Sequence, residues 1–232
     1  MNEITTVGAR VKYAFEDALH PGERPTSGYK TLPNVSQAPE VRLSLNTIDV
    51  SNTQDKITRY VPGRQDPGGE KEFTINHTDE GINEWNTLVA LAETNKAAKL
   101  RLWFEYRYPN ADLSFFFCAT PQQLGNSGFG GNEASTLPGS VVFEEYGGWE
   151  DHSTEISAAS TTASVVKAAT TTVTINNAVG AVKVTSTNKK VATGAYSSNT
   201  LTITGVAAGS AVLTLEDANG DSCAVIVTCT AS

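Results

Sequence analysis

Long apolar runs are missing from this chain of 232 residues. No stretch approaches the roughly 20 consecutive apolar residues that a membrane-spanning helix requires. Hydrophobic residues still make up 39% of the chain, which is enough for packed cores. Residues 1–20 contain no apolar segment after a basic start, so we expect no signal peptide, no membrane insertion and folding in a cytoplasm.

Cysteine is scarce, and its three copies are Cys118, Cys223 and Cys229. An odd number of cysteines is poor material for a disulfide framework. Cys223 and Cys229 belong to one expected strand, where a rise of about 3.3 Å per residue separates them by roughly 20 Å, too far for a bond. We expect all three to be small buried hydrophobic side chains.

Clusters of basic residues are also missing. The formal net charge is −8, and residues 153–232 hold four acids and four bases, so the whole acidic excess lies in residues 1–152. A protein that binds a DNA duplex tightly needs a basic surface that displaces phosphate counterions. Tight duplex binding is therefore not expected, and solubility is the simplest reason for the acidity.

Residue patterns typical of catalysis or metal binding are weak. His20, His77 and His152 lie far apart, with no cysteine or carboxylate at ligand spacing, so we expect no metal and no cofactor. Glu144 and Glu145 could be imagined as glycosidase carboxylates, but nothing in the sequence pairs them across a cleft. We therefore expect no catalytic residues and a protein that is not an enzyme.

The composition changes near residue 150. All three Trp, all eight Phe and all nine Pro precede it, and small and β-branched residues dominate after it. The seam, Asp151–Ser164, is polar and has no hydrophobic period, as is typical of a linker. The sequence thus predicts a first domain over residues 1–152, a linker over 153–163 and a second domain over 164–232.

The second domain consists of short β-branched runs. Val173 and Ile175 alternate with threonines, and Leu201 and Ile203 do the same. Such period-two runs, with turn signals about every 8–12 residues, predict a β-sandwich. Asn219-Gly220 predicts a hairpin turn because both residue types tolerate positive φ.

The first domain is also rich in expected strands, which are Glu40–Asp49, Glu72–His77, Lys99–Tyr108, Leu113–Ala119 and Ser140–Tyr146. In the first of them Val41, Leu43 and Leu45 should face the core. Lys99–Tyr108 alternates in the same way, and Leu113–Ala119 is apolar enough to be buried on both faces.

One helix interrupts these strands over Asp79–Lys99. Its apolar stripe has the helical period and comprises Ile82, Trp85, Leu88, Val89, Leu91 and Ala92. Thr78 offers an N-cap, and acids crowd the first turns, where the helix dipole favours them. The fold class is all-β: a β-sandwich or open barrel with one flanking helix, followed by a second β-sandwich.

Residues of about 160–232 resemble the bacterial immunoglobulin-like family of group 2 (BIG2). The match is carried by Lys190-Val191-Ala192, the corner Gly205–Gly209 and the run Ser210–Val212. Modules of this family occur on adhesins and at the surface of phage virions, and none is an enzyme. The resemblance therefore implies a non-catalytic, Ig-like second domain.

Residues of about 30–150 resemble the major tail tube proteins of long-tailed, non-contractile (siphovirus) bacteriophages. The family's stretch "y-x-p-G-x-x-D-x-G" is met by Tyr60–Gly68, after a strand that ends in Asn46–Asp49. Tyr108-Pro109-Asn110 meets the family's turn in part, since Ala111 stands where glycine is common, and Phe116–Ala119 follows. A tube domain followed by a BIG2 domain is the layout of the lambda-like members.

The resemblance implies a virion protein made in the host cytoplasm. Its subunits would form homohexameric rings stacked into a tube, with an inner β-barrel, and would meet tape measure and tail terminator or tip proteins. Double-stranded DNA would pass without tight binding, and the Ig-like domain would decorate the exterior with weak host-surface contact. A mobile segment, Val50–Gly69, would order against the next ring; its expected contact residues are Thr53, Gln54, Asp55, Lys56, Arg59, Tyr60, Pro62, Gly63, Arg64 and Asp66.

An acidic lumen would repel phosphates and keep the duplex centred. Strand alternation offers candidates on the faces opposite the apolar ones: Glu40, Ser44, Glu72, Thr74, Asn76 and Glu144. An acidic outer surface that serves solubility is the competing explanation. The alternative function is that of a surface adhesin or carbohydrate-binding protein with an Ig-like domain, although no signal peptide is expected.

Overall fold

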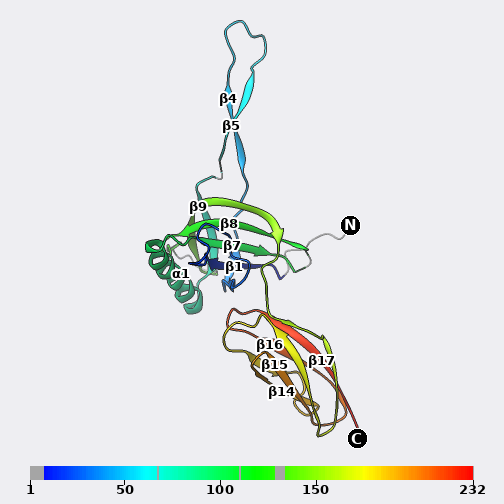
Figure 1. Ribbon diagram of the computed structural model, residues 1–232. Helices are drawn as coiled ribbons and strands as arrows, with labels where there is room; N and C mark the ends of the chain where they lie inside the picture. Colours follow the sequence, from blue (N-terminus) through cyan, green and yellow to red (C-terminus); the bar gives the residue numbers. More distant parts are fainter. Residues whose placement is uncertain (1–7, 67, 110, 129–133, 232) are drawn as a thin grey trace. The chain divides into compact units, whose positions relative to one another are not determined.

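A computed structural model describes residues 8–66, 68–109, 111–128 and 134–231 (Figure 1). The chain is 51% strand, and the described part holds one helix, which confirms the predicted all-β class. It divides into two compact units. The first comprises Met1–Pro25 and Leu32–His152, and the second comprises Thr26–Thr31 and Ser153–Ser232.

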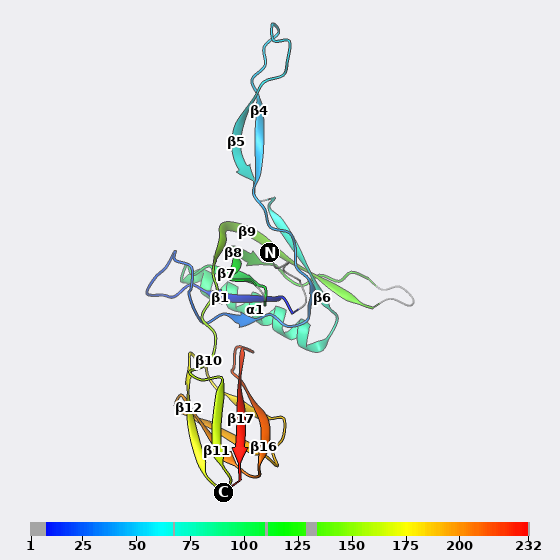
Figure 2. The same cartoon turned by 90° about the vertical axis from the view of Figure 1, so that its right-hand side faces the viewer.

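A sheet of six strands forms the body of the first unit, in the order β1-β7-β8-β9-β6-β3 (Figure 2). The strands are β1 (Arg10–Phe15), β3 (Val35–Gln37), β6 (Glu70–Asn76), β7 (Leu102–Arg107), β8 (Leu113–Pro121) and β9 (Thr136–Asp151), whereas the short strand β2 (Lys30–Thr31) lies in the segment that belongs to the second unit. β1, β7, β8, β9, β6 and β3 pair in antiparallel fashion along this order. Two further strands, β4 (Ser44–Asp49) and β5 (Tyr60–Asp66), form a separate two-stranded sheet.

Helix α1 (Asp79–Ala97) covers one face of this sheet. Its start is the predicted one, because the Thr78 hydroxyl accepts a hydrogen bond from the Gly81 N–H at 3.0 Å. Trp85, Leu88 and Val89 of the predicted stripe are buried in the core. Leu91 is 41% exposed, so its predicted burial is wrong.

The core of the first unit lies between α1 and the sheet. Phe73 and Ile75 of β6 are fully buried, as their alternation predicts. They meet aromatic side chains of the central strands, where the rings of Phe104 and Phe117 stack with centroids 5.2 Å apart. Residues 114–119 of β8 are buried throughout, which confirms the prediction that this strand is covered on both faces.

Two predictions about strand faces are wrong. β4 begins only at Ser44 and leaves the sheet, so Leu45 is 52% exposed instead of facing the core. The reason is that β4 finds its partner in β5, and a lone pair of strands has no layer to cover either face. In β7 the expected outer face is buried as well, since Trp103 and Glu105 are 3% and 0% exposed.

The second unit is a β-sandwich of two four-stranded sheets, as predicted. One sheet has the order β10-β12-β15-β14, from Ser157–Ala158, Thr170–Asn176, Thr200–Gly205 and Ala192–Ser197. The other has the order β11-β17-β16-β13, from Thr162–Val166, Ser222–Thr230, Gly209–Glu216 and Lys183–Ser186. Val173, Ile175, Leu201 and Ile203 lie buried between the two sheets, which confirms their alternation.

Residues 153–163, for which the sequence predicts a linker, are ordered within the second unit. They hold β10, the start of β11 and Ile156, which is buried in the core of the sandwich. The segment Thr26–Thr31 joins this unit from far upstream: the Thr31 N–H donates to the Asn219 carbonyl at 3.0 Å. Asn219-Gly220 forms the predicted turn between β16 and β17, with Gly220 at φ 79°.

Candidate functional site

The hairpin formed by β4 and β5 is an exposed part of the first unit. It extends away from the sheet as a narrow ribbon (Figures 1 and 2), and every β4 residue is exposed. Six large apolar side chains on it are at least 40% exposed: Leu45, Ile48, Val50, Ile57, Tyr60 and Val61. The chain itself therefore leaves these side chains in water.

The register of the hairpin is fixed near its base by a bulge. Leu45 pairs with Gln65, but Thr47 pairs with Pro62, so two residues of β5 lie opposite one residue of β4. Gly63 is one of the two, and a Cβ there would lie 2.9 Å from the Asn46 carbonyl oxygen, so only glycine fits. The other feature of this stretch is Pro62, which has no backbone N–H to donate. An edge strand tolerates this missing donor.

Local polar contacts organise the tip of the hairpin. The Asp49 carboxylate accepts from the Ser51 N–H at 2.8 Å, and the Ser51 hydroxyl accepts from the Arg59 N–H at 2.8 Å. Hydrogen bonds to the Ser51 side chain and backbone lower the pKa of Asp49. The Asp55 N–H donates to the Asn52 carbonyl, and the Asn52 N–H donates to the Asp55 carboxylate, each at 3.0 Å. These contacts fold the tip of the hairpin into a turn.

All ten predicted contact residues lie on this hairpin. Thr53, Gln54, Asp55, Lys56 and Arg59 belong to the tip, and Tyr60, Pro62, Gly63, Arg64 and Asp66 belong to β5. Two residues of the quoted motifs, Pro67 and Asn110, lie outside the described residues. The geometry thus gathers the predicted set on one projecting element.

The predicted lumen residues are divided between two places. Glu72, Thr74 and Asn76 alternate with the buried residues of β6, so they lie on the sheet face opposite α1. Glu144 lies on β9, where its carboxylate accepts from Thr120 Oγ1 and from Cys118 Sγ. Ser44 is instead at the base of the hairpin, and Glu40 precedes it and lies 3.5 Å from Arg42.

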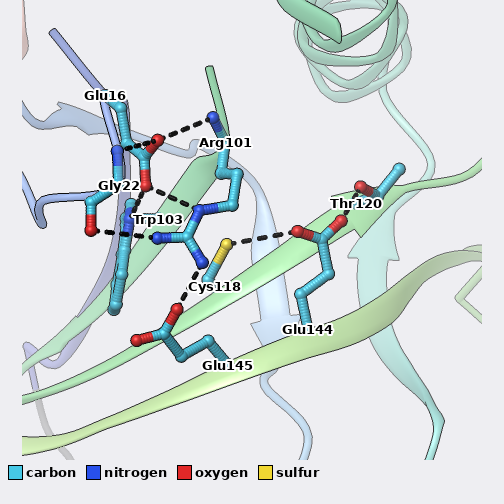
Figure 3. A network of polar contacts seen from close by, with 8 residues as sticks. All are labelled: Glu16, Gly22, Arg101, Trp103, Cys118, Thr120, Glu144 and Glu145. Carbon is cyan, nitrogen blue, oxygen red and sulfur yellow. Dashed lines mark hydrogen bonds and ion pairs between the residues drawn. The ribbon is translucent and has the colours of Figure 1, made fainter. Parts of the chain in front are cut away.

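A network of charged side chains, of which only Glu16 is fully buried, occupies the same sheet face near β1 (Figure 3). Arg101 donates from Nε to Glu16 Oε1 at 2.8 Å and from Nη1 to Glu145. Glu16 is 3% exposed and also accepts from Trp103 Nε1 and the Gly22 N–H, each at 3.0 Å. One arginine therefore joins the end of β1 to β9.

The protonation of two groups in this network is set by their surroundings. Burial by itself raises the pKa of Glu16, but hydrogen bonds from Trp103, Gly22 and Arg101 outweigh it, so the pKa is lowered. Burial raises the pKa of the Cys118 thiol, and the nearby Glu144 raises it further. Cys118 is thus a neutral buried thiol and not a nucleophile.

Sequence reasoning missed this network. Glu16 and Arg101 are 85 positions apart, and no local pattern connects residues at that distance. The one available signal was the alternation of Lys12, Ala14 and Glu16 along residues 10–16, which places charges on the face opposite Val11 and Tyr13. Within the described ranges, no group of three or more His, Cys, Asp or Glu side chains is placed to hold a metal ion.

Comparisons with known proteins do not assign this chain to a family. No family model and no curated protein match the chain. Two solved structures are similar to it at low TM-score: the phage p2 baseplate in its activated conformation with Sr (13% identity, TM-score 0.32) and domains 1–6 of the surface layer protein SbsC (17% identity, TM-score 0.31). The matches cover 65% and 91% of this chain but only 46% and 31% of those chains. TM-scores of this size do not establish a shared fold. The helix of the described part is too short or too polar to cross a membrane.

Proposed function

We propose that this chain is a structural virion protein that polymerises through its β4–β5 hairpin into stacked hexameric rings, the tail tube of a long-tailed phage. The observation that carries the proposal is the exposed apolar hairpin. An isolated two-stranded ribbon is marginally stable in water, and open strand edges favour pairing with another chain. A second copy of this chain is the partner that a polymer would supply.

The hairpin suits polymerisation better than closed dimerisation. It is a projecting element, and the body of the first unit holds no second hairpin of this kind among the described strands. A contact between a projection and a different surface of the next copy is heterologous, and such contacts generate rings or open filaments. This agrees with the stacked rings that the family resemblance implies.

The acidic face of the sheet supports a role as a conduit for DNA. Glu72 and Glu144 are exposed on the face opposite α1, and the exposed Glu70 lies two residues before Glu72 on the same strand, whereas Glu145 is paired with Arg101. Repetition of this face around a ring would give a negative lumen that repels phosphates. DNA would then pass during ejection without being held.

The second unit would decorate the tube exterior. The four acids and four bases of residues 153–232 balance, and the strands there face solvent with rows of threonine, so this part of the unit presents a nearly neutral β-sandwich surface. Weak contact with the host surface is the role that the BIG2 resemblance suggests. The tape measure and tail terminator or tip proteins would be the other partners, and the chain would act without catalysis.

A pair of exposure-matched variants tests the proposal. Ile57 at the hairpin tip is 80% exposed, and Leu19 in another loop is 81% exposed. We expect Ile57→Ser to reduce assembly strongly and Leu19→Ser to leave it unchanged, because only Ile57 would be buried between copies. Sedimentation velocity of concentrated protein measures the assembled fraction. Equal assembly of the two variants and the parent chain would reject the hairpin as the assembly element.

A further inference from the structure

Three large apolar side chains lie exposed and close together on the sheet of the first unit. Leu19 in a loop, Leu91 on α1 and Val142 on the opposite sheet face are exposed singly. Outside the hairpin, the other exposed large apolar side chains described in this unit are Leu113, Tyr146 and Trp149. We call these three residues the aromatic patch.

The aromatic patch lies on the sheet face that carries the core. Leu113 and Phe115 share one face of β8, and Trp149 is the cross-strand partner of Phe115. The buried ring of Phe115 contacts the rings of Tyr146 and Trp149, with centroids 5.3 Å and 5.4 Å apart. Tyr108 stacks on Trp149 at 6.0 Å. The patch is therefore a continuation of the aromatic core that is left in water.

The exposure of Trp149 is the strongest sign of a missing partner. Its side chain is 54% exposed, whereas Trp85 and Trp103 are 0% and 3% exposed. Contiguous exposed apolar side chains mark interaction sites on soluble proteins. The two ring contacts hold Trp149 in place, so a partner would meet a surface that is already formed.

The strand edge beside the patch is open. β6 pairs with β9 only as far as Val142, and among the described strands the later part of β9 pairs with β8 alone. The hairpin has the same property, because β4 pairs with β5 and with no other described strand. Open edges favour pairing with a strand of another chain. A strand of the hairpin therefore suits the open edge of β9.

The charges around the two surfaces are complementary. Asp112 precedes the leucine of the patch and Asp151 lies opposite it on β9, and both are exposed. At the hairpin tip, Ile57 lies between Lys56 and Arg59, which are exposed as well. The tip, residues 52–59, holds these two bases against one acid. Contact between the two surfaces would bring bases to acids around an apolar centre.

We propose that the aromatic patch is the surface on which the β4–β5 hairpin of a second copy docks. The inference rests on the proposed function, and it names the surface that the hairpin would meet. The hairpin extends away from the sheet of its own chain (Figure 1), so its partner patch belongs to another copy. Each copy then offers its hairpin to one neighbour and its patch to another, which is a heterologous contact.

Two leucines of equal exposure test the proposal. Leu113 in the patch is 40% exposed, and Leu91 on α1 is 41% exposed. We expect Leu113→Ser to raise the protein concentration for half-assembly by about tenfold, because a buried leucine contributes that much to a contact. Leu91→Ser should assemble like the parent chain. Sedimentation velocity over a range of concentrations provides the measurement.

The outcomes separate this inference from the proposed function. If Leu113→Ser assembles like Leu91→Ser while Ile57→Ser does not assemble, the hairpin remains the assembly element and the patch is rejected as its partner. If Ile57→Ser also assembles like the parent chain, the proposed function fails and this inference fails with it.

A mixture of two assembly-deficient chains tests the contact itself. Ile57→Ser keeps the patch and loses the apolar tip, and Trp149→Ser keeps the hairpin and damages the patch. Each should remain monomeric alone. Mixed, they should form pairs that cannot grow, because the free hairpin and the free patch of a pair are both defective.

Tryptophan fluorescence reports on this pairing. Trp85 and Trp103 are buried, so the accessible tryptophan in the mixture is Trp149 of the Ile57→Ser chain. Acrylamide quenching should therefore decrease on mixing. Unchanged quenching without pairs would overturn the proposal, and so would protection of Trp149 in the Ile57→Ser chain alone, because another surface would then cover the patch. The leucine pair decides the question even where Trp149→Ser does not fold.

Discussion

Ser44 and Asp66 lie opposite each other where the β4–β5 hairpin begins, and the Ser44 hydroxyl donates to the Asp66 carbonyl at 3.0 Å. The two chain ends of the hairpin are therefore already held at strand-pairing distance. Every residue between them belongs to the projecting ribbon, whose large apolar side chains remain exposed. The hairpin is thus a separable element of the first unit.

Removing the hairpin should leave the rest of the chain folded. Replacing residues 45–65 with Asn-Gly would join Ser44 to Asp66 through a two-residue turn that strand pairs favour. We expect the free energy of unfolding to change by roughly 0.5 kcal/mol or less, since none of the deleted residues belongs to the buried core. Chemical denaturation measures it, and a large loss would show that the hairpin supports the body.

The Glu16–Arg101 pair should stabilise the first unit at neutral pH. Glu16→Gln removes a charged acceptor from Arg101 and Trp103, and we expect a loss of roughly 2 kcal/mol. The pKa of Glu16 is lower in the folded than in the unfolded chain, so its contribution is present at neutral pH and disappears as the pH falls through the folded value. The difference between the two chains should therefore shrink in acid.

The control for this prediction is Glu93→Gln on the exposed side of α1, which should leave the free energy of unfolding unchanged at every pH. Denaturation midpoints of both variants and the parent chain between neutral and acidic pH provide the measurement. A difference for Glu16→Gln that persists unchanged in acid would contradict the assigned pKa direction.

Reversal of the proposed lumen charges should slow the ejection of DNA through the tube. Lysines in place of Glu70, Glu72 and Glu144, which are exposed on the sheet face opposite α1, would add phosphate contacts in every subunit, and such contacts accumulate into salt-dependent binding. We expect tubes that still form but eject DNA more slowly, with the defect relieved at high salt. The control with equal charge change replaces Glu23, Glu93 and Glu216, which are also exposed. Normal ejection by the first variant from well-formed tubes would show that these acids do not line the lumen.

The second unit should be dispensable for tube formation. A chain that stops after His152 keeps the whole core of the first unit. It loses the partners of Thr26–Thr31, where Tyr29 is 1% exposed, so the companion change Tyr29→Ser would keep the cut chain soluble. We expect tubes of smaller outer diameter in electron micrographs. Failure of the first unit to fold would place the boundary elsewhere.

Much of the fold could be predicted because local patterns determine it. Phe73 and Ile75 alternate within one strand, and Thr78 precedes an apolar stripe of helical period, so β6 and α1 needed no long-range information. The residues around Leu45 alternate in the same way as those of β6, yet β4 pairs only with β5 and lies away from the core. An alternating pattern specifies faces and does not specify the partner strand.

The candidate site was predictable only where its residues are close in sequence. The ten contact residues fall within one short segment, so they share the hairpin whatever the rest of the chain does. The Glu16–Arg101 pair joins residues 85 positions apart. Such contacts depend on the order of strands in the sheet, and the sequence of each strand does not contain that order.

Electron microscopy of the concentrated chain, beside the variant without residues 45–65, tests the central claim most directly. The account predicts tubes of stacked rings with six-fold end views for the parent chain, because six copies per ring follow from the family resemblance. It predicts dispersed, folded monomers for the variant. Dispersed monomers of the parent chain, or tubes formed equally well by both chains, would contradict it.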